Sequence, residues 1–203
     1  MPRPRVHDLD LVLDSAESLA AADGPAAVTT RAVATASGVS NGAIYHNFGS
    51  RAELVARTWL RAAHRFLDVQ TELVDAASAE DPVEAVVAAA AAPIEFARRW
   101  PASAELLLRV RRDHLLDEVP ASVAADLDAC QRALIDLMQR LAMRLWNRQD
   151  RVAVDAITVC IVDLPTSIIL SRNRITNTWV HARLKAAVRA VLAEQPPTAR
   201  RRK

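Results

Sequence analysis

Apolar residues recur at helical spacing along almost the whole chain, and this pattern decides the fold class. Between residues 9 and 23 they occupy every third or fourth position, namely Leu9, Val12, Leu13, Ala16, Leu19 and Ala20. Comparable spacing continues to about residue 194, and no segment alternates between apolar and polar residues as a strand does. The 203 residues contain only four glycines, whereas Ala, Leu and Arg, which favour helices, are frequent. We therefore predict an all-α protein.

Glycines, prolines and capping residues divide the N-terminal part of this pattern into short pieces. Gly24-Pro25 is expected to end a first helix, Gly38 a second and Gly49-Ser50 a third. One residue of Thr29-Thr30 should cap the second helix, and one of Ser40-Asn41 the third. Their side-chain oxygens can accept hydrogen bonds from the free backbone N–H groups at a helix start. The sequence thus predicts three consecutive helices before a long one that starts near residue 51.

Residues 29–48 form a candidate helix-turn-helix. Gly38 can supply the positive φ that a tight turn between the second and third helices needs. A small shared core is expected from Val33, Val39, Ile44 and Phe48, with the small Ala34 where the two helices cross. The third helix would then project outward, as a DNA recognition helix does, the residues Asn41, Gly42, Ala43, Tyr45 and His46.

The order of residues around this motif resembles the TetR family of bacterial one-component transcription regulators. A helix of 15 residues precedes it, and a Gly-Ser-Arg-x-x-Leu start of a long helix follows it directly. The positions that carry the resemblance are Thr29, Val33-Ala34, Ser37-Gly38-Val39-Ser40, Gly42, Tyr45, Phe48 and Arg51. The resemblance covers residues 9–60, and the rest of the chain agrees only in length and helical character. Three positions depart from the family pattern: Ala20 replaces a common aromatic residue, Asn41 a frequent Lys and Asn47 a common His.

The resemblance implies that the third helix enters the major groove of DNA. Asn41, Gly42, Ala43 and His46 would face the bases, and Thr30, Ser40, Tyr45 and Arg51 would hold phosphates. The lost positive charge at residues 41 and 47 would shift phosphate binding onto Arg3, Arg5 and Arg51. Structural interpretations stay open beside these. The hydroxyl residues can be helix caps, the tyrosine half-buried packing, and the remaining polar residues a solvated face.

The resemblance also implies how the chain is organised and what it does. It predicts a DNA-binding domain over residues 1–50, a helical ligand-binding and dimerisation domain over residues 51–195 and a basic tail over residues 196–203. It implies a repressor that leaves an inverted-repeat operator in double-stranded DNA when a small-molecule effector binds. The effector and the residues that contact it stay unknown. A mostly apolar cavity is expected within residues 80–170, where Pro93 predicts a kink or a break in a helix.

The last two helices, over residues 151–170 and 177–194, are expected to build a homodimer. Asp150 and Asn177 are their expected caps. Paired with the same helices of a second copy they would form a four-helix bundle with two-fold symmetry. The apolar stripes expected to lie exposed on a single chain are Val159, Val162, Thr166, Leu170, Val180, Leu184, Val188 and Val191.

The sequence argues against several other classes of protein. Cys130 and Cys160 lie far apart, and no Cys/His cluster has metal-ligand spacing, so no metal or cofactor is predicted. An enzyme on a helical fold is an open alternative, but no nucleophile, phosphate-loop or paired-carboxylate motif supports it. The N-terminus lacks the apolar stretch of a signal peptide, and residues 156–170, interrupted by Asp163 and Pro165, are too short to span a bilayer. We expect a cytoplasmic protein without membrane contact.

Charge keeps a further class open, that of a helix-turn-helix that binds a protein instead of DNA. The chain has a formal net charge of +2. Residues 1–50, however, contain three arginines and five acidic residues, which gives a net charge of −2. A DNA-binding surface in this segment must therefore come from where its side chains are placed and not from bulk charge.

Overall fold

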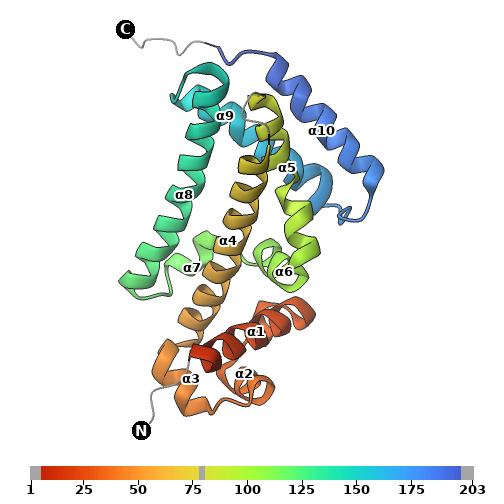
Figure 1. Ribbon diagram of the computed structural model, residues 1–203. Helices are drawn as coiled ribbons and strands as arrows, with labels where there is room; N and C mark the ends of the chain where they lie inside the picture. Colours follow the sequence, from red (N-terminus) through yellow and green to blue (C-terminus); the bar gives the residue numbers. More distant parts are fainter. Residues whose placement is uncertain (1–5, 78–80, 198–203) are drawn as a thin grey trace. The chain divides into compact units, whose positions relative to one another are not determined.

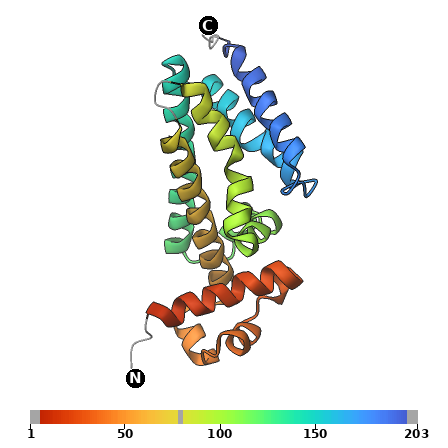
Figure 2. The ribbon, with the colours of Figure 1, turned by 45° about the vertical axis from the view of Figure 1, so that its right-hand side comes forward.

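The computed structural model describes residues 6–77 and 81–197 (Figures 1 and 2). These residues form helices and turns and no β-strand, which confirms the all-α prediction. The α-helices are α1 (Val6–Asp23), α2 (Thr30–Ser37), α3 (Asn41–Phe48), α4 (Arg51–Ala76), α5 (Pro82–Arg99), α6 (Pro101–Arg109), α7 (Arg112–Leu116), α8 (Ala121–Trp146), α9 (Arg151–Thr158) and α10 (Thr178–Ala193). A 3-10 turn, η1, spans Pro25–Ala27, and two π-helical segments follow α9, namely η2 (Val159–Asp163) and η3 (Thr166–Leu170). The predicted roles of Arg3 and Arg5, and most of the predicted basic tail, lie outside the described residues.

Four helices, α2, α3, α9 and α10, begin where a hydroxyl, carboxylate or amide side chain accepts a hydrogen bond from backbone N–H groups. Thr29, not Thr30, caps α2, because its hydroxyl accepts from the Ala32 N–H at 3.1 Å. Ser40, not Asn41, caps α3 through the Ala43 N–H at 3.2 Å. Asp150 and Asn177 cap α9 and α10 as predicted. Such caps stabilise helix starts that would otherwise leave N–H groups without partners.

The chain folds into two compact units, and the two longest helices contribute to both. The first unit contains residues 6–65 and 100–130, and the second contains residues 66–99 and 131–197. The first thus combines α1, α2, α3, the start of α4, α6, α7 and the start of α8. These units are defined by packing, and the functional boundary predicted after residue 50 stays a prediction.

A buried carboxylate joins three helices of the first unit. Glu17 of α1 is 4% exposed. It accepts hydrogen bonds from Arg61 Nε at 3.1 Å, from Arg65 Nη1 at 3.1 Å and from the Ser103 hydroxyl at 2.9 Å. Arg61 also lies 2.8 Å from the carboxylate of Asp14. The network fixes α1 against α4 and α6, and the charge of the buried carboxylate is balanced by two guanidinium groups.

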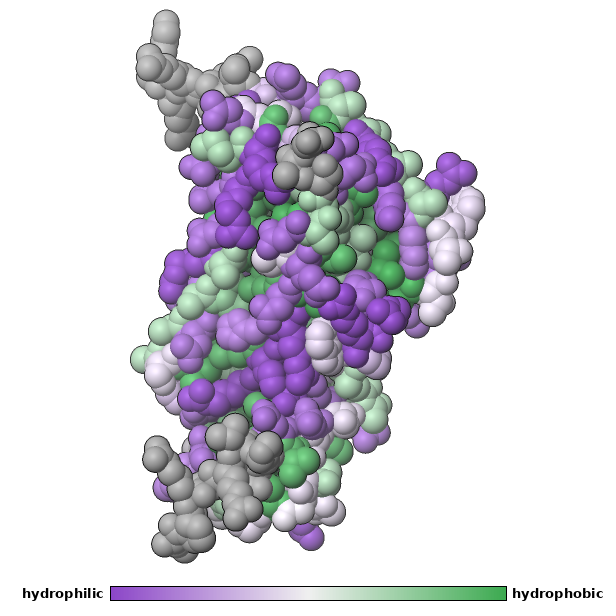
Figure 3. All heavy atoms as spheres, viewed as in Figure 1, coloured by the Kyte–Doolittle hydropathy of each residue, from purple (hydrophilic) through white to green (hydrophobic). Residues whose placement is uncertain are grey.

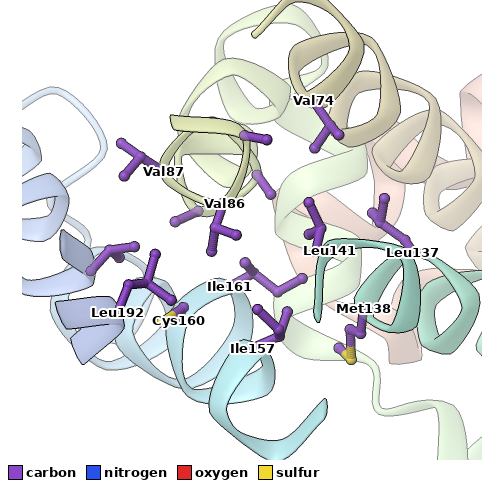
Figure 4. Packing of buried hydrophobic residues seen from close by; sticks show 14 of the residues in the cluster. Val74, Val86, Val87, Leu137, Met138, Leu141, Ile157, Cys160, Ile161 and Leu192 are labelled. Atoms are coloured by element: carbon purple, nitrogen blue, oxygen red, sulfur yellow. The ribbon is translucent and has the colours of Figure 1, made fainter. Parts of the chain in front are cut away.

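The second unit has an apolar core drawn from α4, α5, α8, α9, η2, η3 and α10 (Figure 4). In the close-up, Val86 of α5 and Ile161 of η2 point toward one another, with Leu141 of α8 beside them. Helix α5 runs unbroken through Pro93. Of the two expected outcomes there, a kink or a break, the break does not occur. With residues 151–155 included, the apolar helix Arg151–Leu170 has 20 residues, which by length and composition alone could span a membrane. It is a partly buried core helix of this unit, with Ile157, Cys160 and Ile169 fully buried.

Part of the predicted dimer stripe is buried within the chain itself. Helix α10 contacts α5, and its Val180, Leu184 and Val188 are at most 4% exposed in this single chain. These three residues therefore do not form an exposed stripe, and that detail of the prediction was wrong. Apolar spacing alone predicted a buried face of α10, but it did not indicate which neighbour covers it.

The described depressions do not form the enclosed apolar cavity expected within residues 80–170. One, of about 390 Å³, is lined by α1 and α2, including Leu11, Leu19 and Ala36. Another, of about 350 Å³, is mostly polar and lies beside the end of α8 and Pro196. The cavity stays a prediction.

We expect Glu17→Ala to destabilise the protein by about 2–3 kcal/mol, because Arg61 and Arg65 would lose their buried counter-charge. Urea unfolding measures this change in the free energy of unfolding. Asp14→Ala is the matched control. Asp14 contacts the same Arg61 from a side chain that is 60% exposed, so its replacement should lower the free energy of unfolding by less than about 1 kcal/mol. Equal costs for the two variants would contradict the role of burial.

Candidate DNA-binding site

Helices α2 and α3 are joined by a turn at Gly38 with left-handed backbone geometry. Gly38 has φ 73°, and its N–H donates to the Ala34 carbonyl at 3.0 Å. A Cβ placed on Gly38 would meet no atom within 4 Å. The requirement for glycine is therefore a matter of backbone conformation and not of space. The next N–H, that of Val39, donates to the Ser37 hydroxyl at 3.2 Å, which completes the turn.

One face of α3 is anchored in the core of the first unit. Ile44 and Phe48 are 1% and 4% exposed, and Val33 of α2 is fully buried. Val39 is half-buried. The predicted core of the helix-turn-helix is thus present, and it fixes which residues of α3 face outward.

The opposite face of α3 carries the residues predicted to contact bases. Asn41, Gly42 and His46 are exposed, and Ala43 is half-buried. A Cβ placed on Gly42 would meet no atom within 4 Å, so none of the described residues requires glycine there. The close backbone approach to DNA that glycine permits is the predicted reason for it. Asn47 is half-buried, and its amide donates to the Ala43 carbonyl of the same helix at 2.7 Å.

The residues predicted to hold phosphates differ in their freedom to do so. Tyr45 is 66% exposed, and no hydrogen-bond partner of its hydroxyl occurs among the described residues. Half-buried packing therefore does not account for this tyrosine. Ser40 is exposed but already accepts a bond as the cap of α3. Thr30 is half-buried at the start of α2.

Arg51 has a structural role that the sequence analysis missed. Its Nε donates to the Val28 carbonyl at 2.7 Å, and its Nη2 donates to the Pro25 carbonyl at 2.6 Å. The side chain thereby ties the first turn of α4 to the segment between α1 and α2. The sequence carried no signal for this contact, because it joins residues more than 20 positions apart through backbone oxygens.

The acidic balance of residues 1–50 is offset by arginines of α4. Asp14 and Glu17 pair with Arg61 at 2.8 Å and 3.0 Å, and Glu17 also pairs with Arg65 at 3.1 Å. These acids therefore face the scaffold. The count of charges in the N-terminal segment, which favoured a protein-binding motif, does not describe the outward surface of α3.

Residues 12–58 match the model of the family described as bacterial regulatory proteins of the tetR family. This segment of the chain is therefore similar to the N-terminal part of TetR-family regulators. The matched segment runs from α1 into α4 and contains the whole helix-turn-helix.

Solved structures of TetR-family regulators share the fold of this chain. A TetR-family transcriptional regulator from Streptomyces coelicolor is 19% identical with a TM-score of 0.64, covering 92% of this chain and 98% of its own. PfmR from Thermus thermophilus is 17% identical with a TM-score of 0.65, covering 91% and 99%. The fatty acid degradation regulator FadR from Bacillus halodurans is 16% identical with a TM-score of 0.66, covering 92% and 98%. At these identities the likeness concerns the fold alone. No curated protein matches this sequence.

Arg51→Ala should lower the free energy of unfolding by about 1–2 kcal/mol, because two hydrogen bonds from a charged donor to the Pro25 and Val28 carbonyls are lost. Chemical denaturation measures it without DNA. Arg31→Ala, at an exposed arginine of α2, is the control and should change stability by less than about 0.5 kcal/mol. A neutral Arg51→Ala would show that these bonds do not hold the motif.

Proposed function

We propose that this protein is a TetR-family regulator, a cytoplasmic repressor that binds an inverted-repeat operator as a homodimer and leaves it when a small-molecule effector binds. The observation that supports it is the outward face of α3. Asn41, Gly42 and His46 are exposed, with the half-buried Ala43 beside them, on a helix whose other face is held by Ile44 and Phe48. An eight-residue helix fixed in this way has the dimensions to lie in a major groove.

In this proposal the exposed residues divide into two classes. Asn41, Gly42, Ala43 and His46 face base edges, where the Asn41 amide can pair with adenine. Thr30, Ser40, Tyr45 and Arg51 hold phosphates. Among these, Tyr45 is best supported by its exposure. Arg51 has one guanidinium nitrogen, Nη1, without a hydrogen bond to the described residues, and it would use that nitrogen for phosphate while the other two hold the motif.

An inverted-repeat operator requires two copies of the chain related by two-fold symmetry. The outward face of α10 supports such pairing. Trp179 is 64% exposed. It is followed on the same face of α10 by the exposed alanines Ala182, Ala186, Ala190 and Ala193. Small residues allow two helix backbones to approach closely, and an exposed Trp adds apolar area. The space-filling view also shows apolar side chains at the surface near α5 and the 151–170 helix (Figure 3).

A small molecule can drive release only if it binds one state of the protein more tightly than another. The second unit supports an apolar ligand, since its core is formed by aliphatic side chains and alanines. Derepression then follows when the ligand favours a state that fits the operator poorly. Gel-shift titration on the DNA upstream of the protein's own gene, with and without small molecules, tests both halves of the proposal.

We expect Tyr45→Phe and Asn41→Ala to weaken operator binding in different ways. Tyr45→Phe removes only the hydroxyl, so affinity for cognate and scrambled DNA should fall by a similar factor. Asn41→Ala should cost about 1–3 kcal/mol per specific contact and relax preference at one position of each half-site. Titrations on both DNAs at several salt concentrations measure these effects, and the slope against salt counts the phosphate contacts.

Arg51→Ala tests another proposed phosphate contact in these titrations, and Glu17→Ala is the comparison for a change of stability alone. Arg51→Ala should weaken binding to all sequences and reduce the salt slope by about one ion per subunit beyond its effect on stability. Unchanged affinity in Tyr45→Phe, Asn41→Ala and Arg51→Ala, with the fold intact by circular dichroism, would exclude α3 as the DNA-binding helix.

We expect Ala186→Arg to convert a dimer into a monomer, because a charged side chain would replace a small one in the centre of the α10 face. Sedimentation velocity at micromolar concentration distinguishes the two states. Ala133→Arg places the same change at an exposed alanine of α8 and should remain dimeric. A monomeric wild-type protein would refute the homodimer itself.

A further inference from the structure

Helix α5 contains a proline whose consequences reach α4. Pro93 has no N–H to donate, so the carbonyl of Ala89, four residues earlier, loses its intrahelical partner. The Gln70 side chain of α4 fills this place: its amide Nε2 donates to the Ala89 carbonyl at 3.2 Å. Helix α5 can therefore continue unbroken from Pro82 to Arg99 although it contains a proline.

This bond decides how the Gln70 amide is oriented and leaves its oxygen unpaired. A carbonyl accepts and cannot donate, so the amide nitrogen must face Ala89 and Oε1 must point elsewhere. Gln70 is 1% exposed, and its Oε1 is buried without a hydrogen-bond partner among the described residues. A buried acceptor without a partner destabilises the folded state, and a hydrogen bond from a donor removes this cost.

The buried residues that neighbour Gln70 along α4 are apolar, and the part of α5 that it bonds is rich in small side chains. In the described part of the second unit, Gln70 is the only polar side chain that is buried. One helical turn before it, Phe66 packs edge-to-face on Phe96 of α5 with ring centroids 5.5 Å apart. One turn after it, Val74 belongs to the aliphatic core (Figure 4). On α5, residues 88–92 are five consecutive alanines, so side chains there occupy little volume.

We infer that Gln70 is the polar contact of an effector site between α4 and α5, and that the effector is an uncharged, mostly apolar molecule with one hydroxyl or N–H donor. The inference rests on the proposed function, because it gives a location and a chemical class to the ligand of that regulator. The donor of the ligand bonds Gln70 Oε1, and its apolar body lies along the alanines between the aromatic pair and the aliphatic core.

The charge of the ligand and its number of hydrogen-bond donors follow from the same residues. The buried part of the site offers one acceptor and no ionised group, so an anion or a cation would lose its hydration without compensation. Two donors would leave one unpaired for the same reason. Selectivity should therefore depend on the presence of a single donor, since a site built around one buried acceptor discriminates against ligands that lack its partner.

Binding of matched pairs of probes to the purified full-length protein tests this site. The pairs are indole and 1-methylindole, 1-naphthol and 1-methoxynaphthalene, and decan-1-ol and 1-methoxydecane, in which methylation removes the only donor. At least one donor probe should bind. The ratio of its affinity to that of its methylated partner should be about three- to tenfold higher for wild-type protein than for Gln70→Met. Taking the ratio between proteins cancels the difference in hydrophobicity within each pair. Isothermal titration calorimetry gives the affinities.

Gln139→Met is the matched control, since it makes the same change at a half-buried glutamine of α8 and should keep the wild-type ratio. Gln70→Leu replaces Gln70→Met if the latter does not fold by circular dichroism. Absence of saturable binding for all three donor probes, or the same ratio in wild-type and Gln70 variants, overturns the inference; the latter result would mean that a buried water satisfies Oε1.

The outcome is separable from that of the proposed function. Gln70 variants should bind operator DNA like the wild type in the absence of probe, because no residue of α3 is changed. Operator binding together with failure of every probe would refute this site and leave the repressor proposal standing. Probe binding with no operator binding would refute the repressor and leave the site.

Discussion

The stability of the proposed DNA-binding surface depends on contacts outside the helix that forms it. Helices α2 and α3 have eight residues each, and isolated helices of that length are not stable in water. Their structure is maintained by burial of Val33, Ile44 and Phe48 and by the Thr29 and Ser40 caps. The same burial turns Asn41, Tyr45 and His46 outward. The face of α3 proposed for DNA recognition thus consists of the residues that folding leaves outside the core.

Several arginines near the helix-turn-helix bond other groups of the same chain, so the proposed DNA affinity must come largely from other contacts. Arg61 and Arg65 balance the buried Glu17, and Arg51 bonds two backbone carbonyls. A guanidinium group suits such positions because its planar set of donors can bond several oxygens at once and stays charged. Phosphate contacts from hydroxyl groups and from the N–H groups at a helix start become correspondingly more important. Charge counted along the sequence could not distinguish arginines with these internal partners from free ones.

Local sequence signals predicted the helices and their ends well, and contacts between distant residues poorly. The all-α fold, the turn at Gly38 and the caps Asp150 and Asn177 follow from periodicity and from hydrogen bonds within a few residues. The outward face of α3 followed from the same periodicity. The bonds of Arg51 and the burial of Glu17 depend on which elements meet in space, and the spacing of apolar residues does not specify that. For the same reason the apolar stripe of α10 was correctly recognised but given the wrong neighbour, since Val180, Leu184 and Val188 are buried within the same chain, where α10 contacts α5 and η3.

Pro93 shows how a residue that weakens a helix can define a site elsewhere. Proline in a helix interior removes one hydrogen bond and exposes a carbonyl. Here a glutamine of another helix supplies the missing donor, and α5 keeps its helical course. The glutamine cannot satisfy both of its own polar groups by that single contact, because donor and acceptor are fixed at opposite sides of one planar amide. An apolar substitution at residue 70 would avoid the unpaired oxygen but would leave the Ala89 carbonyl without a donor. The unpaired Gln70 oxygen is therefore a consequence of keeping Pro93 within α5, and it places a single polar group in an otherwise apolar core.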